Sequence, residues 1–239
     1  MDRRLTTRGA QRRRQLIAFA TRRFAERGYH PTSVAEIVAG VGVGKGVFYW
    51  YFASKDALFL EILREAQHDL RRRQSEAIEG ASTPVERIER GVRASMEWSA
   101  ANRDLLTLIH FAATEEAFAP AIRKGEEVAV ADAARHIRDA MSEGEVPEAD
   151  AELLAHAMLG VAGHLARTYL HERRRDTAVV ADAAVAFCLG GVLGPRPAAR
   201  PAAGSSTRPP ARSSAPAMGE PATGEPAVTA PAAGVSRAL

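Results

Sequence analysis

The sequence predicts an all-α protein of about nine helices, and two observations support this fold class. Apolar residues recur three and four positions apart in one segment after another, which is the spacing of one face of an α-helix. Strand-like alternation bounded by hairpin turns is absent from the 239 residues. This length suffices for one large domain or two small ones, with a sizeable core.

The first two helices are expected near the N-terminus. The segment from Arg8 to Glu26 has an apolar face opposite its arginines, and Gly28 follows at the position where glycine commonly ends a helix. Thr32 or Ser33 caps a second short helix, because a side-chain oxygen there accepts from a free backbone N–H group. Gly42 permits the tight turn that follows.

The remaining helices begin at recognisable caps. A third short helix extends through Tyr49, and Ser54 is placed to cap a fourth. Thr83, Pro84 and Glu86 together form a strong start signal, with a cap, a proline in the first turn and a capping box. Further helical patterns cover residues 103–113, 120–142, 148–172 and 177–193.

The composition changes abruptly after Gly194. The last 45 residues hold nine of the thirteen prolines and almost no large apolar residue. Such a segment buries too little surface to offset its ordering entropy, so we expect a disordered tail. The predicted organisation is an N-terminal helical domain with a basic arm over residues 1–53, a longer helical domain over 54–194, and the tail over 195–239.

Positive charge is concentrated at the N-terminus, although the formal net charge of the chain is only +3. Between Met1 and His30, nine arginines are opposed only by Asp2 and Glu26. A basic end of this kind is the electrostatic pattern of a polyanion contact. A solvated arginine arm is the alternative.

Several classes of protein are disfavoured by composition. A single cysteine, Cys188, excludes an intrachain disulfide and a cysteine-rich metal site, and its apolar surroundings predict a buried thiol. The N-terminus has no apolar core of a secretory signal, and no window reaches the length of a membrane span. We expect a cytoplasmic protein that does not enter a membrane.

The segment from Thr32 to Phe59 carries the clearest functional signal. Two short helices joined by a glycine-bearing turn fit a helix-turn-helix, whose second helix enters the major groove of DNA. Glycines near the start of that helix let the DNA backbone approach, and lysine, tyrosine and tryptophan donate to phosphates or bases. The residues predicted to face DNA are Gly44, Lys45, Val47, Tyr49, Trp50 and Lys55, with solvated surface as the alternative. Phe48, Tyr51 and Phe52 are predicted to belong to the core.

The run RGYHPTSVAEIVAGVGVGKGVFYWYFASKDALF resembles the N-terminal domain of the TetR (tetracycline-repressor-like) family of bacterial transcriptional regulators. The resemblance spans roughly Arg14 to Phe59. It implies a homodimer in which helices one to three, within the helix-turn-helix DNA-binding domain over 1–53, bind double-stranded operator DNA. The variable helical domain over 54–194 would then bind a small effector and dimerise. It also places Thr32, Ser33 and Lys55 at phosphate-contacting positions.

The chain departs from the family pattern within the recognition helix. Gly44 stands where serine is common, Val47 where threonine or serine is frequent, and Trp50 where histidine or arginine is frequent. Few side chains of this helix therefore form hydrogen bonds to bases. We expect operator preference to depend on Lys45, apolar methyl contacts and DNA shape.

An effector pocket is predicted in the second, longer helical domain. By the resemblance, the apolar and polar residues expected to line it are Trp98, Leu105, Ile109, His110, Phe111 and Phe118, and plain core is the alternative for the apolar ones. His156 and His164 share a helix face, but no metal motif accompanies them. Small residues at Gly160 and Gly163 suggest close helix approach, and the resemblance places the dimer interface on the last two helices.

These features favour a ligand-responsive DNA-binding regulator, most simply a repressor released from a pseudo-palindromic operator by a small hydrophobic effector. A non-specific nucleoid protein that uses the arginine-rich end is a second hypothesis. An enzyme is disfavoured because no nucleophile–base spacing, phosphate loop or metal motif is present. No cofactor is expected.

Overall fold

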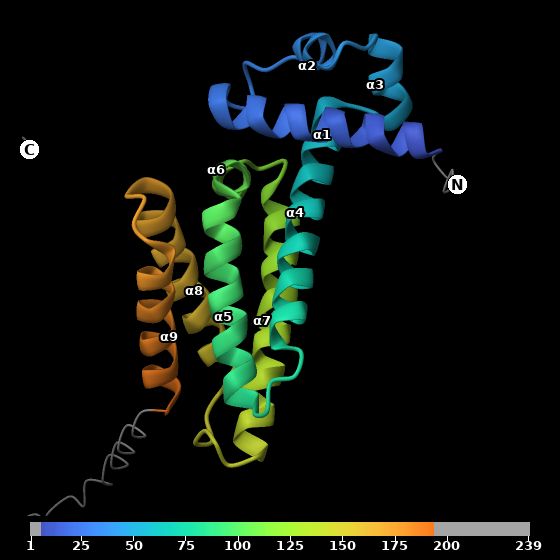
Figure 1. Ribbon diagram of the computed structural model, residues 1–239. Coiled ribbons are helices and arrows are strands. Elements are labelled where there is room, and N and C mark those ends of the chain that lie inside the picture. The colour runs from blue at the N-terminus through green and yellow to red at the C-terminus, as the bar shows by residue number, and fades with distance from the viewer. Residues whose placement is uncertain (1–5, 194–239) are drawn as a thin grey trace, which may run out of the picture. The chain divides into compact units, whose positions relative to one another are not determined.

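The computed structural model describes residues 6–193. Within that range the chain forms nine α-helices and one π-helical segment, without any strand, so the predicted all-α class is confirmed. The elements are α1 (Thr7–Arg27), α2 (Val34–Val41), α3 (Lys45–Tyr51), α4 (Lys55–Ile78), α5 (Pro84–Ala101), α6 (Arg103–Thr114), α7 (Ala119–Ser142), α8 (Ala151–Leu165), η1 (Ala166–Glu172) and α9 (Thr177–Leu193) (Figure 1). The predicted tail over 195–239 and the first residues of the basic arm lie outside the described residues.

Local capping chemistry explains where α1 and α2 begin and end. The hydroxyl of Thr6 accepts from the N–H of Gly9 at the start of α1, and Gly28 ends that helix with a φ of 85°. Ser33 caps α2 by accepting from the N–H of Glu36. Gly42 ends α2 in the left-handed conformation with a φ of 71°, which a side chain would strain, and this turn directs the chain into α3.

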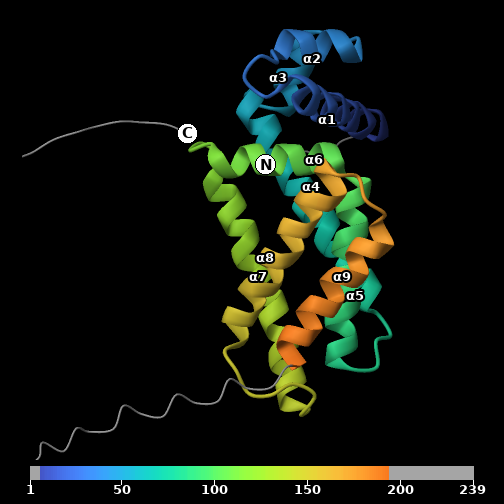
Figure 2. The same ribbon diagram turned by 90° about the vertical axis from the view of Figure 1, so that its left-hand side faces the viewer.

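One apolar cluster joins α1, α2 and α3 to α4, α6 and α7. Leu16 and Phe24 from α1 are buried with Ile37 from α2 and Phe48 from α3. Other members come from later in the chain, and they are Leu58, Phe59, Ile62 and Leu63 of α4, Leu108 and Ala112 of α6, and Ile122 of α7. Figures 1 and 2 both show α6 running beneath α1. The N-terminal helices are therefore packed directly on the longer helices that follow.

The remaining helices enclose further cores. Ile137 and Ala140 of α7 pack with Ala155 of α8, and Cys188 of α9 is buried among them, as its apolar surroundings predict. The capping box before α5 forms, with Thr83 accepting from the N–H of Glu86. The Glu86 carboxylate reaches back one residue further than expected, to the N–H of Ser82 at 2.6 Å.

The helix predicted over 148–172 differs from the structure at both ends. It begins at Ala151 because Asp150 is the better cap, accepting from the N–H groups of Glu152 and Leu153 at 3.0 Å. From Ala166 to Glu172 the backbone widens into a π-helix, and the N–H of Arg173 bonds five residues back to Thr168.

Between residues 6 and 193, no single helix is long and apolar enough to cross a membrane; α6 and α7 meet the length and composition test only jointly, across a 112° bend.

Candidate nucleic-acid interface

The α3 helix presents two contrasting faces. Phe48 is fully buried in the N-terminal core, as predicted, and Phe52 just after the helix is 5% exposed. On the opposite side Tyr49 is 56% exposed and Trp50 is 52% exposed. Large aromatic side chains are seldom left so open to solvent without a partner, so this face is the first candidate for a macromolecular contact.

The start of α3 is open to close approach. Gly44 occupies the N-cap position, and its lack of a side chain leaves the first N–H groups of the helix without a side-chain cap. Apart from the adjoining residues and the helix backbone, no atom of residues 6–193 lies within 4 Å of the place where a Cβ would stand on Gly44 or Gly46. Lys45 and Val47 are exposed on the same short helix. A phosphate backbone can therefore approach these N–H groups without obstruction.

Tyr51 connects this helix to the beginning of α1. Its hydroxyl donates to the carbonyl oxygen of Gly9 at 2.9 Å, and its ring meets Trp50 edge-on with centroids 4.5 Å apart. Tyr51 is half-buried, in keeping with the structural role predicted for it. Because the hydrogen bond to Gly9 fixes Tyr51, the exposed ring of Trp50 packs against an immobilised ring.

Thr32 and Ser33 occupy different environments although both were predicted to contact phosphate. The Thr32 side chain is 1% exposed, and its hydroxyl donates to the carbonyl of Gly28 at 2.8 Å. Ser33 is exposed and accepts from the N–H of Glu36 at 3.2 Å, which leaves its own hydroxyl hydrogen available. Ser33 is thus accessible to a phosphate, whereas Thr32 stabilises the turn.

Lys55 holds the loop before α2 in place. Its Nζ donates to the carbonyl oxygens of Tyr29 at 2.9 Å, Thr32 at 3.0 Å and His30 at 3.4 Å. The same ammonium lies over the Tyr29 ring, 4.2 Å from its centre. Burial lowers the pKa of Lys55, while neighbouring Asp56 opposes that shift. These contacts engage all three N–H groups of the ammonium. No sequence pattern indicated that Lys55 would hold this loop.

An aromatic cluster lies between this loop and the α6–α7 region. The Tyr29 ring stands 4.8 Å from Phe59, 5.1 Å from Phe118 and 5.7 Å from Phe111, centroid to centroid. Its hydroxyl donates to Asp56, and burial together with that bond raises the pKa of Tyr29. We call Tyr29, Phe59, Phe111 and Phe118 the aromatic junction.

The arginines of α1 divide into paired and unpaired groups. Arg13 bonds to Glu61 and, at 2.6 Å, to Glu65, while Arg23 bonds to Glu36 at 2.5 Å. These arginines attach α1 to α4 and α2. Over residues 6–193, the α1 arginines without an ion pair are Arg8, Arg12, Arg14 and Arg22.

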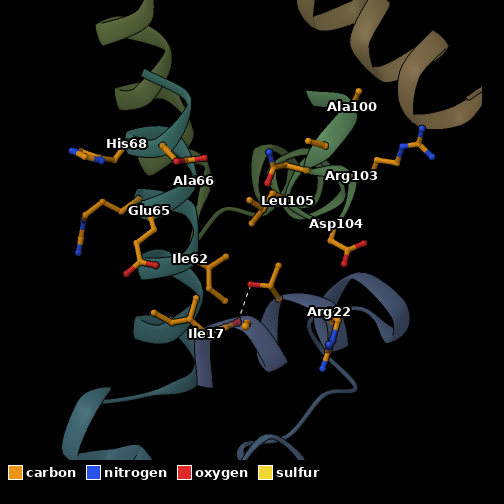
Figure 3. Close-up of a pocket in the computed structure, with 16 residues that line it drawn as sticks. Ile17, Arg22, Ile62, Glu65, Ala66, His68, Ala100, Arg103, Asp104 and Leu105 are labelled. Atoms are coloured by element: carbon orange, nitrogen blue, oxygen red, sulfur yellow. Dashed lines mark hydrogen bonds between the residues drawn. The ribbon is translucent and has the colours of Figure 1, made fainter. Parts of the chain in front are cut away.

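The six residues predicted to line an effector pocket are not gathered around one space. Trp98 is buried and donates from Nε1 to Asp69 at 2.8 Å. Phe111 and Phe118 belong to the aromatic junction, and Ile109 packs beside the cores of α4 and α6. Leu105 lines a cavity of about 880 Å³ between α1, α4 and the α5–α6 connection (Figure 3). That cavity contains none of the other five.

His110 lies on another side of α6, facing η1. Its ring centre is 6.4 Å from that of His171. Burial lowers the pKa of His110, Arg167 and His171 lower it further, and Glu172 opposes the shift. The imidazole is therefore favoured in its neutral form.

Comparison with known proteins supports the N-terminal assignment. Residues 16–62 match the family model described as bacterial regulatory proteins, tetR family. The HTH-type transcriptional regulator HbdR of Aromatoleum sp. is 33% identical over 100 residues, which cover 42% of this chain and 44% of HbdR. The HTH-type transcriptional repressor DhaR of Mycobacterium sp. is 40% identical over 86 residues, 36% of this chain and 43% of DhaR. The chain thus spans less than half the length of these two relatives.

A solved structure extends the likeness over the helical bundle. A protein from Syntrophomonas wolfei, described as a TetR-family transcriptional regulator, superposes with a TM-score of 0.70 at 21% identity, covering 77% of this chain and 96% of that one. At this identity the likeness shows the fold.

Proposed function

We propose that this chain, which belongs to the TetR family of bacterial regulatory proteins, is a DNA-binding transcriptional regulator that a small hydrophobic effector releases from its operator. The observation that carries the proposal is the exposed face of α3, where Lys45, Tyr49 and Trp50 follow a glycine turn. Repression is the simplest outcome of such binding, and DhaR among the relatives is named a repressor.

Each exposed residue of α3 has a role suited to its chemistry. Lys45 donates to base edges or phosphates, and Val47 contacts thymine methyl groups. The hydroxyl of Tyr49 and the indole N–H of Trp50 donate to phosphate oxygens. Because the helix has few base-reading hydrogen bonds, operator preference depends on Lys45, methyl contacts and DNA shape.

The residues next to α3 complete the DNA-facing surface. The backbone N–H groups in the first turn of α3, which Gly44 leaves uncapped, and the hydroxyl of Ser33 bind phosphate. Thr32 and Lys55 mainly hold the loop before α2 in position, while Lys55 adds positive charge to the same surface.

A homodimer brings two such surfaces onto the two halves of a pseudo-palindrome. The outer side of α8 and α9 supports this, because Leu153 is 66% exposed, Val179 61% and Phe187 66%. Small residues at Gly160 and Ala183 line a shallow groove beside Phe187. A Phe187→Glu variant should be monomeric in light scattering, whereas Val128→Glu, an exposed control on α7, should remain dimeric.

Release by an effector follows from linkage. An effector that binds more tightly to a form with wrongly spaced recognition helices lowers the affinity of the protein for DNA. By linkage, bound DNA lowers the affinity for the effector by the same factor. The protein acts in this scheme as a cytoplasmic regulator without catalysis or cofactor.

Footprinting on the DNA upstream of the chain's own gene tests the proposal. We expect a protected pseudo-palindrome, lost with Lys45→Ala and largely kept with Tyr49→Phe. The opposite ranking of these two variants would refute the proposed basis of operator preference. Binding that is equal on all sequences, with a steep dependence on salt, would instead indicate a non-specific DNA-binding protein.

A further inference from the structure

The loop at residues 28–33 leads from α1 into α2, and its own hydrogen bonds keep it compact. Gly28 takes a φ of 85°, which few side chains tolerate, and the Thr32 hydroxyl donates back to the Gly28 carbonyl at 2.8 Å. Ser33 caps α2 directly afterwards. Whatever fixes this loop therefore also fixes the start of α2 and, through the turn at Gly42, the direction of α3.

Polar contacts attach the loop to the start of α4. The Lys55 ammonium donates to the carbonyl oxygens of Tyr29 and Thr32 at 2.9 and 3.0 Å. The Tyr29 hydroxyl donates to the carboxylate of Asp56. Because hydrogen bonds weaken when their angles change, these contacts fix the loop relative to the first turn of α4.

Aromatic rings attach the same loop to the α6–α7 region. The Tyr29 side chain is 6% exposed, and its ring centroid lies 5.1 Å from that of Phe118 and 5.7 Å from that of Phe111. Phe118 is buried at the N-cap position of α7, and its ring meets Tyr29 edge-on, one of the preferred arrangements of an aromatic pair. Tyr29 thus joins the helix-turn-helix to a part of the bundle that does not include α4.

The next residue of the loop reaches the same region from outside. The Nε2 of His30 lies 3.5 Å from a carboxylate oxygen of Glu115, and the His30 ring meets that of Phe111 edge-on. The His30 side chain is 68% exposed, so this ion pair adds little to the attachment. The buried ring of Tyr29 makes the stronger contact.

The other apolar contacts between α1 and α6 restrict the loop less. Leu16 of α1 and Leu108 of α6 belong to one apolar cluster, and Figures 1 and 2 show α6 running beneath α1. Apolar burial is non-directional, so it tolerates small rotations of one helix on another. A tyrosine ring within the aromatic junction tolerates them less, since its hydroxyl and its carbonyl are also bonded to α4.

We propose that Tyr29 is the positioning residue of the helix-turn-helix: it attaches the loop before α2 to α4 and to the α6–α7 region at once, and so fixes the angle of α3 on the bundle. The consequence for DNA rests on the proposed function. In a dimer this angle sets the distance between the two recognition helices, and with it the half-site spacing that the protein accepts. A looser joint lets each recognition helix adapt to a wrong spacing, and it weakens binding at the right one.

The joint can be loosened from the side of the bundle. Phe118→Leu keeps an apolar side chain at the start of α7 but removes the ring that packs on Tyr29. Val130→Ala is the matched control, a loss of buried carbon on the same helix in the core that α7 forms with α8. Neither position belongs to the surface proposed to face DNA.

Paired spin labels measure the placement of α2 on the bundle without DNA. Ala35→Cys on α2 and Arg138→Cys on α7 supply two exposed attachment sites, and Cys188→Ala removes the only native thiol. Dilution with unlabelled chain leaves only the distance within one chain, whatever the oligomeric state. In this background we expect Phe118→Leu to broaden the distribution of distances, and Val130→Ala to leave it unchanged.

The half-site spacing of the operator tests the consequence for DNA. One base pair inserted at the centre of the footprinted operator moves the half-sites apart by about 3.4 Å and turns them by about 35°. We expect this insertion to weaken binding of the unaltered protein at least about tenfold. The weakening should be at least about threefold smaller for Phe118→Leu and undiminished for Val130→Ala. Because each variant is compared on two operators, a change in its folded fraction cancels from the ratio.

The outcomes separate this inference from the proposed function. If Phe118→Leu and Val130→Ala give the same distance distribution, Tyr29 does not position the helix-turn-helix, even where operator DNA is protected. If the distribution broadens but both variants discriminate alike against the insertion, the joint does not set the half-site spacing and the inference is wrong. A broadened distribution with no protected operator would leave the positioning role standing and refute the regulator.

Discussion

The ammonium nitrogen of Lys55 lies 2.9 Å from the carbonyl oxygen of Tyr29 and 4.2 Å from the centre of the Tyr29 ring. One side chain at the start of α4 therefore fixes the loop that leads into the helix-turn-helix. The same tyrosine contacts Phe111 and Phe118 from the α6–α7 region. A shift of α6 or α4 consequently reaches the loop through the contacts of Tyr29.

Replacing Lys55 by methionine should destabilise the DNA-free chain. The change leaves the carbonyls of Tyr29, His30 and Thr32 without their donor, which costs about 1–3 kcal/mol. Urea unfolding followed by circular dichroism measures this loss. Lys45→Met is the control: Lys45 is exposed, so its replacement should change stability by less than about 0.5 kcal/mol. The same variant should reduce the slope of log DNA affinity against log salt concentration by about one. Equal stability of the two variants would contradict the role given to Lys55.

Neighbouring aromatic residues of α3 should separate stability from DNA binding. Phe48→Ala opens a cavity in the N-terminal core and should cost about 3–5 kcal/mol. Trp50→Ala removes a half-exposed ring and one aromatic contact, so its cost should be about 1 kcal/mol or less. Operator affinity, measured by fluorescence anisotropy at constant salt, should nevertheless fall strongly for Trp50→Ala. Undiminished affinity would remove Trp50 from the interface.

Stability should decrease as the solution is acidified through the range in which free histidine titrates. Burial lowers the pKa of both His110 and His136, with added effects of Arg167 on the first and Arg135 on the second. Below about pH 6.5 the unfolded chain binds protons that the folded chain resists, so stability rises with pH across this window and is lost on acidification.

The double variant His110→Gln with His136→Gln tests whether these two histidines make stability rise with pH. Urea midpoints at pH 5.5 and 7.5 should differ less in the variant than in the unaltered chain. His156→Gln, a change at an exposed position on α8, should keep the full difference. If the urea midpoint of the unaltered chain rose on acidification, the predicted direction of the pH dependence would be wrong.

Cys188 should react slowly with thiol reagents in the folded protein. It is 3% exposed in the α7–α8–α9 core, and burial raises the pKa of its thiol. At pH 8 its labelling should be at least about 100-fold slower than in urea, because reaction requires the thiolate and local opening. Rapid stoichiometric labelling without denaturant would show that this part of the core opens readily.

Local chemistry explains why the helix boundaries could be predicted. Ser33, Ser54 and Thr83 each accept from the N–H group three residues later, as the predicted caps require. The division of α3 into buried Phe48 and exposed Trp50 also follows from helical periodicity alone. The widening of the backbone from Ala166 had no comparable local signal.

Contacts between distant segments could not be predicted in the same way. Tyr29 and Phe118 are separated by 89 positions, and nothing in an amphipathic pattern states which apolar face meets which. The Lys55 contacts and the cavity beside α1 depend on such pairings. The six residues predicted for an effector pocket share a stretch of sequence, but Trp98, Leu105 and His110 face three different neighbours.

The aromatic junction limits how this protein can be recombined with its relatives. A graft that transfers α1 to α3 onto another bundle would carry Tyr29 away from Phe59, Phe111 and Phe118. The Tyr29 ring would then pack against side chains that are adapted to a different N-terminal domain. Hybrid regulators built from this chain should therefore exchange the recognition residues within α3 and retain the loop at 28–33 together with its partners Phe59, Phe111 and Phe118.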